Sequence, residues 1–87
     1  MIIKKGLMLK EIAGNYVVVA VGSATKTLNG VITLNKTGAF LWELLEKGAD
    51  VDFLVCSLVS NFKVDKATAT RDVEGFIARL KSADLLA

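Results

Sequence analysis

The stretch LNGVITLNKTGAFLWELL, residues 28–45, contains the change from strand to helix on which the fold depends. Its Asn-Gly pair at 29–30 is the strongest short signal for a β-hairpin, because both residues tolerate the positive φ of a type I′ turn. Residues 31–35 are then predicted as a strand, and Asn35 or Thr37 can cap the N-terminus of a helix. That helix continues through apolar residues at helical spacing, namely Phe40, Leu41, Leu44 and Leu45.

The sequence upstream of this stretch predicts two more strands. A Gly-Asn pair at 14–15 suits a two-residue hairpin turn between segments 7–13 and 16–28. The second segment is too long for one regular strand, so the Gly-Ser pair at 22–23 is expected to bend or bulge it. Together with residues 31–35, these segments form an antiparallel meander.

The sequence downstream predicts three helices in all. The first ends at Gly48, and the second begins at Asp50 or Asp52. The third begins after Asp65, a good capping residue, and runs to about Asp84. The apolar stripes are Val51, Leu54, Val55, Leu58 and Phe62 on the second helix, and Ala69, Val73, Phe76, Ile77 and Leu80 on the third. A three-stranded antiparallel sheet followed by three helices is an α+β, winged helix-turn-helix-like fold.

Composition limits what this fold can do. Residues 1–87 are expected to form a single domain, because a chain of this length buries too little of its surface on folding to build a second hydrophobic core. The chain has no His and one cysteine, Cys56, so it lacks the commonest general base and cannot form an internal disulfide or a thiolate metal cage. We therefore expect a cytoplasmic non-enzyme without cofactor, with Cys56 in the core or at its boundary. The longest apolar run, 16–21, is too short to span a membrane.

The edge of the predicted sheet is the first candidate binding surface. Segment 31–35 carries no Glu or Pro and no Lys, the residues that usually guard an exposed edge strand. An unguarded edge can accept an extended peptide by strand addition, in which main-chain hydrogen bonds supply affinity and side-chain pockets supply selectivity. The alternative is that a helix or a second subunit covers this edge.

The third predicted helix offers a second wall for the same peptide. Thr68, Asp72, Gly75 and Arg79 fall within about 40° of one another on its surface. Gly75 costs roughly 1 kcal/mol in a helix interior relative to Ala, and a groove that must admit a peptide side chain explains that cost. Close helix packing at Gly75, and a solvated face at Asp72 and Arg79, are the alternatives.

Three motifs, in order and spacing, resemble the family of PqqD-like proteins. The stretch 28–45 resembles their strand-to-helix signature, and residues 62–65, FKVD, resemble the aromatic-x-V-D that precedes their third helix. Residues 72–80, DVEGFIARL, resemble the third helix itself. Each motif alone is mostly apolar pattern, but together they cover about residues 7–86.

The resemblance implies a peptide chaperone, also called a RiPP recognition element, of the coenzyme PQQ synthesis protein D type. Such a protein binds the leader peptide of a ribosomally made precursor as an extra strand and serves a modifying enzyme, often a radical S-adenosylmethionine enzyme. The chain would act as a separate protein. On this resemblance, the strand contacts are Val31, Ile32, Thr33 and Leu34, and the opposite wall is Thr68, Asp72, Gly75, Phe76 and Arg79.

Two other functions compete with this one. A winged helix-turn-helix DNA-binding protein has the same architecture, but the third helix carries Asp72, Glu74 and Asp84 and no Asn or Gln. Phosphates repel those carboxylates, and the net charge of +2 is a weak basic excess. A homodimer that pairs its open edges is the other candidate, and it is compatible with peptide binding.

Overall fold

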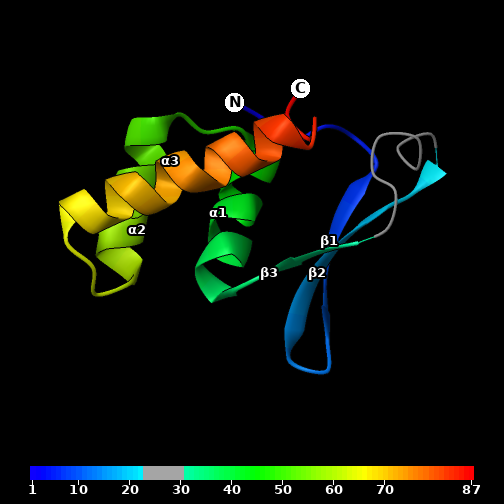
Figure 1. Cartoon of the computed structure of the whole chain (residues 1–87), viewed down its shortest axis with the longest axis horizontal. Helices are drawn as coiled ribbons and strands as arrows, with labels where there is room; N and C mark the ends of the chain where they lie inside the picture. The colour runs from blue at the N-terminus through cyan, green and yellow to red at the C-terminus, as the bar shows by residue number, and fades with distance from the viewer. Residues whose placement is uncertain (23–30) are drawn as a thin grey trace.

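Three antiparallel strands precede three helices in the computed structural model, which describes residues 1–22 and 31–87 (Figure 1). The elements are β1 Leu7–Ile12, β2 Asn15–Ala20, β3 Ile32–Leu34, α1 Lys36–Lys47, α2 Val51–Asn61 and α3 Lys66–Ser82. This order confirms the predicted α+β class, while the winged helix-turn-helix likeness stays a prediction. The predicted turn at 29–30 lies outside the described residues.

The turn between β1 and β2 falls one residue earlier than predicted. Ala13 and Gly14 have φ values of 52° and 82°, and Ile12 pairs with Asn15. The predicted turn at 14–15 is wrong because it would place Glu11 opposite Val18, which is completely buried. In the observed register Val18 lies opposite Leu9, so burial of the apolar face decides the pairing.

Strand β2 lies in the middle of the sheet and pairs with β1 and β3. It ends at Ala20, two residues before Gly22, whose φ of 60° fits the expected bend. The predicted continuation over 23–28 lies outside the described residues. Strand β3 is shorter than the predicted 31–35 and is an edge strand, with Thr33 opposite Val17.

The helices gather at one end of the sheet, and the β1–β2 turn points away from them (Figure 1). Fully buried side chains from both halves of the chain form one core: Val18, Trp42, Leu45, Leu54, Leu58, Ala69, Val73 and Leu85. On α2, however, Val51 and Cys56 are exposed. The prediction that Cys56 lies in the core or at its boundary is wrong, because Leu54, Val55 and Leu58 turn the buried face of α2 away from it.

Both chain ends are held against the same side of the molecule (Figure 1). Ile3 and Leu86 form an antiparallel bridge, and Lys4 Nζ lies 2.9 Å from a carboxylate oxygen of Asp84. The N-terminal segment therefore anchors the end of α3. Among the described residues, no helix combines the length and apolar character that a membrane span requires.

Each helix starts at a side-chain cap. Asn35 accepts the N–H of Gly38 at 2.8 Å, and Asp50 accepts that of Phe53 at 2.8 Å. The structure thus selects Asn35 and Asp50 from the predicted alternatives, and it confirms the cap at Asp65. These caps satisfy backbone N–H groups that have no partner within the first turn of a helix.

The Asp65 cap predicts a loss of stability in acid. The backbone N–H of Thr68 donates to Asp65 at 2.7 Å and lowers the pKa of this carboxyl from its ordinary 3.8, with further lowering by the Thr68 side chain and Arg71. The pKa of Asp65 is therefore lower in the folded chain than in the unfolded chain. The stability that the ionised Asp65 carboxylate contributes is complete above pH 3.8 and is lost as the pH falls through the folded pKa. Thermal melts from about pH 5 to about pH 2 should show a smaller acid loss for Asp65→Asn than for the parent chain. Equal losses would contradict this role of Asp65.

Candidate functional site

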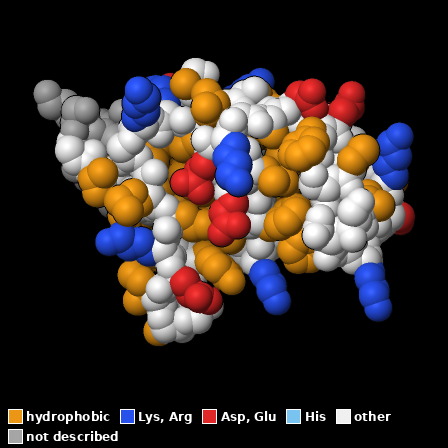
Figure 2. All heavy atoms as spheres, turned by 180° about the vertical axis from the view of Figure 1, so that it is seen from behind, with side chains coloured by type: hydrophobic (Ala, Val, Ile, Leu, Met, Phe, Trp, Pro, Cys, Tyr) orange, Lys and Arg blue, Asp and Glu red, His pale blue; other side chains and the backbone are white. Residues whose placement is uncertain are grey.

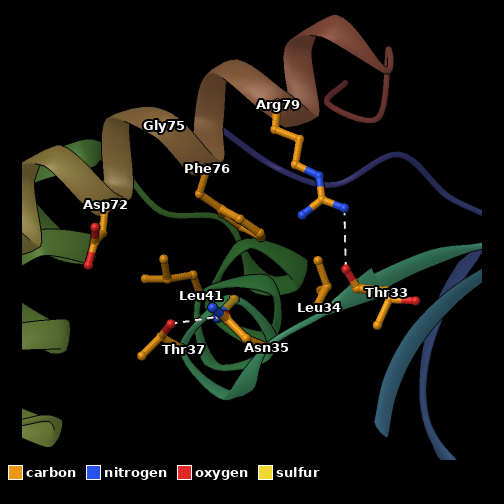
Figure 3. A pocket seen from close by; sticks show the side chains of 10 residues that line it. Thr33, Leu34, Asn35, Thr37, Leu41, Asp72, Gly75, Phe76 and Arg79 are labelled. Atoms are coloured by element: carbon orange, nitrogen blue, oxygen red, sulfur yellow. Dashed lines mark hydrogen bonds between the residues drawn. The ribbon is translucent and has the colours of Figure 1, made fainter.

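A groove of about 510 Å³ runs between β3 and the start of α1 on one side and α3 on the other (Figure 3). We call it the β3–α3 groove. Its lining residues are Thr33, Leu34, Asn35, Thr37, Gly38, Leu41, Asp72, Gly75, Phe76 and Arg79. The two walls come from segments that are far apart in sequence, so only the folded chain forms this surface.

The centre of the groove is apolar. Leu34 and Leu41 are buried beneath it, and the half-buried ring of Phe76 points from α3 toward them (Figure 3). A Cβ atom at Gly38 would lie 3.1 Å from the Asn35 side chain and 3.4 Å from the Phe76 ring. Gly38 therefore leaves room for the capping oxygen of Asn35, and the Phe76 ring lies close to the first turn of α1. This arrangement offers contact to one apolar side chain of a ligand.

The ends of the groove carry opposite charges. Asp72 and Arg79 project from α3 at opposite ends, with Arg79 beside β3 (Figure 3). The Arg79 guanidinium donates from Nη2 to the main-chain carbonyl of Thr33 at 3.2 Å. At the lower rim, the Thr37 hydroxyl donates to Asn35 Oδ1 at 3.0 Å. The groove therefore has an apolar centre, a negative charge at the Asp72 end and a positive charge at the Arg79 end.

Most of the predicted site residues meet in this groove. Those that line it are Thr33, Leu34, Asp72, Gly75, Phe76 and Arg79. Val31, Ile32 and Thr68 do not line it: Val31 is exposed just before β3, and Ile32 is half-buried within the strand. Thr68 lies in the first turn of α3, where its N–H donates to the cap. A role for these three in binding stays a prediction.

Four lining residues were not among the predicted contact residues, although the first of them ends the predicted edge segment 31–35: Asn35, Thr37, Gly38 and Leu41. Sequence reasoning assigned Asn35 and Thr37 to helix capping and Leu41 to the apolar stripe. All four lie within residues 28–45, the stretch that also carries the family resemblance. The resemblance therefore covered these four residues, but the sequence did not distinguish a residue that lines a groove from one that caps a helix or fills the core.

Gly75 lies exposed on the α3 wall, and an added Cβ atom would meet nothing within 4 Å. Close helix packing therefore does not explain this glycine, since packing would place neighbouring atoms against it. The space beside Gly75 opens into the groove, as the sequence hypothesis requires.

Asn35 links the groove to the stability of α1. Its side chain accepts from both Gly38 and Thr37, so Asn35→Ala leaves the first turn of α1 without its cap. We expect the free energy of unfolding to fall by about 1 kcal/mol. Urea unfolding of Asn35→Ala beside Asn35→Asp, which keeps a capping acceptor, tests this. A loss of the same size in both variants would contradict the capping role.

Other surfaces carry less information about function. Among residues 1–22 and 31–87, no group of three or more His, Cys, Asp or Glu side chains is placed to hold a metal ion. The face seen in Figure 2 has acidic and basic side chains interspersed with apolar ones. A second hollow of about 190 Å³ lies beside Tyr16, Phe40 and Phe62.

Two solved structures are similar to this chain along nearly its whole length. The chain is similar to TbiB1, solved in complex with the TbiA(beta) leader peptide, with a TM-score of 0.77 and 24% identity over 99% of this chain and 94% of that one. It is also similar to lasso peptide synthetase B1 complexed with the leader peptide, with a TM-score of 0.74 and 19% identity over 95% and 92% of the two chains. Both likenesses confirm the fold. No curated protein sequence matches the chain.

The comparison with family models covers most of the chain. The model described as coenzyme PQQ synthesis protein D (PqqD) matches residues 15–86, which include β2, β3 and all three helices. Both walls of the β3–α3 groove fall within the matched region. The chain therefore belongs to the PqqD family.

Proposed function

We propose that this chain is a leader-peptide-binding adaptor, which captures a ribosomally made precursor in the β3–α3 groove and presents it to a modifying enzyme. The observation that carries the proposal is the groove itself, with an edge strand on one side and an open helix face on the other. Membership of the PqqD family supports it, as do the two similar structures, each solved with a leader peptide.

The edge of β3 supports strand addition in particular. In the described part of the chain β3 pairs with β2 alone, and its residues include no charged side chain or proline. Thr33 is exposed at the centre of this edge. A peptide that adds to β3 makes main-chain hydrogen bonds along the strand and turns alternate side chains toward Leu34 and Phe76.

The mechanism is positional rather than chemical. An adaptor that holds the leader raises the effective concentration of the attached core peptide at the enzyme, without any bond-making of its own. This role needs no cofactor and no catalytic residue in the chain. Ribosomal precursors and their enzymes meet in the cytoplasm, which is the compartment that the proposal assigns. The radical S-adenosylmethionine enzyme implied by the resemblance stays a prediction.

The charges on α3 weigh against the DNA-binding alternative. Asp72 and Glu74 are both exposed on the helix that would have to enter a groove of DNA. Arg71 and Arg79 are also exposed, so the helix presents both signs together. A recognition helix usually concentrates basic and amide side chains on its outer face.

Fluorescence anisotropy tests the function directly. The probes are fluorescein-labelled leaders of short precursors encoded beside the gene, with a scrambled leader of the same composition as control. We expect saturable binding of one leader and none of the scrambled peptide. Failure of every such leader to bind, together with salt-sensitive binding of a DNA duplex, would favour the DNA-binding alternative.

A further inference from the structure

The contact between Arg79 and Thr33 joins α3 to the edge strand. The guanidinium donates to the Thr33 carbonyl at 3.2 Å, across 46 residues of sequence. Both residues are exposed, so the bond forms at the mouth of the groove and not in the core. In the part of the chain that the structure describes, no carboxylate oxygen lies within 4.0 Å of the Arg79 guanidinium. The salt bridge found there joins Lys4 to Asp84.

The carbonyl that Arg79 occupies is one that strand addition needs. In an antiparallel strand, the N–H and C=O of one residue point to the same side. Ile12 and Asn15 flank the two-residue turn as a hydrogen-bonded pair, so the alternation of pairs turns the N–H and C=O of Val17 toward β1. Thr33 lies opposite Val17, so its N–H and C=O both face the open side of β3. A peptide that pairs there donates its own N–H to this carbonyl. A carbonyl oxygen can accept two hydrogen bonds, but here both donors approach from the open side of β3, so the guanidinium occupies the position that the peptide strand needs.

We infer that Arg79 leaves Thr33 when a peptide binds and pairs instead with an Asp or Glu side chain of that peptide. The inference rests on the proposed function and names the chemistry that the groove selects. Arg79 carries five N–H donors in a planar fork, which match a carboxylate with two parallel bonds. Among the described residues of the free protein, the Arg79 guanidinium makes one hydrogen bond, to the neutral carbonyl of Thr33. A leader carboxylate thus compensates for the bond that strand addition breaks.

Asp72 gives this selection a direction. It lies two helical turns before Arg79, roughly 10 Å along α3, which corresponds to about three residues of an extended peptide. An acidic peptide side chain is repelled at the Asp72 end and attracted at the Arg79 end. The two charges therefore fix which end of the groove receives the acidic side chain, while Phe76 between them contacts an apolar one.

Selection from a random peptide library tests this without knowledge of the natural leader. Displayed peptides of about 15 residues are captured on the parent chain, on Arg79→Met, which keeps an unbranched apolar stem, and on Gly75→Leu, which fills the groove. Peptides captured by the parent but not by Gly75→Leu bind the groove. We expect these to share an apolar anchor and an Asp or Glu at one fixed distance from it. The pool captured by Arg79→Met should keep the anchor and lose the acidic preference.

A charge cycle on one selected peptide gives the quantitative result. Changing its acidic residue to the amide should weaken binding to the parent about two- to fivefold at low salt, as for an exposed ion pair. The same change should leave binding to Arg79→Met unaffected, and the difference should shrink at about 0.5 M sodium chloride. Equal acidic enrichment with parent and Arg79→Met, or no enrichment with the parent, would overturn the inference while peptide binding stands. The absence of any groove-dependent peptide would overturn both proposals.

Discussion

Replacing Gly75 with Leu is expected to weaken leader binding by about 10- to 100-fold while the fold survives. A leucine side chain at this position enters the β3–α3 groove and excludes the apolar peptide side chain that we place beside Phe76. Burial of one such side chain is worth about 1.5–3 kcal/mol, and each 1.4 kcal/mol changes affinity tenfold. Fluorescence anisotropy with the labelled leader measures the loss directly.

Gly75→Ala is the matched control for this variant. An added Cβ atom meets nothing within 4 Å, and alanine favours a helix interior by about 1 kcal/mol over glycine. We therefore expect the melting temperature to rise by about 4–8 °C, with a loss of affinity much smaller than that of Gly75→Leu. Unchanged leader binding by Gly75→Leu would contradict the placement of the groove. A fall in stability of Gly75→Ala would contradict the open space beside Gly75.

Replacing Thr33 with Pro is expected to weaken leader binding about tenfold or more. Proline removes the N–H that we place on the open side of β3 and leaves a peptide carbonyl without its donor, at a cost of about 1–3 kcal/mol. The hydrogen bonds between β3 and β2 do not use that N–H, and an edge strand tolerates proline on its free side. Titration of the labelled leader into Thr33→Pro, after circular dichroism has confirmed its fold, makes the measurement.

Thr33→Val separates the backbone from the side chain. Valine keeps the N–H, the β-branched shape and the preference for strands, and it removes the hydroxyl. If the peptide adds as a strand, Thr33→Val binds the leader nearly as well as the parent chain does. A folded Thr33→Pro that binds as tightly as Thr33→Val would show that the peptide does not pair with this N–H.

The helices were largely predictable from sequence because their signals are local. Caps at Asn35, Asp50 and Asp65, and the glycine at 48, each state where a helix begins or ends within a few residues. Apolar spacing then orients the helix toward the core. The same locality explains the error at Cys56, since a helix with apolar residues on several sides does not reveal which of them the core will cover.

The first turn and the groove depend on contacts between distant parts of the chain. A glycine next to an asparagine allowed two adjacent turn positions, and only the burial of Val18 opposite Leu9 decided between them. The wall formed by Asp72, Gly75 and Arg79 was predictable because it lies on one helix face. The floor at Gly38 and Leu41 was not, because a buried leucine and a small residue in a first turn look the same whether or not a groove lies above them.

Amide-resolved NMR titration of the labelled protein with its leader tests the central claim most directly. Strand addition in the groove predicts that the largest shifts fall on the amides of Thr33 and Leu34 in β3 and of Asp72, Gly75 and Phe76 in α3. The Thr33 amide should also become protected from hydrogen exchange, because the bound peptide accepts its N–H. Shifts that concentrate on β1 or α2, with the Thr33 amide still exchanging freely, would place the peptide elsewhere and contradict the account.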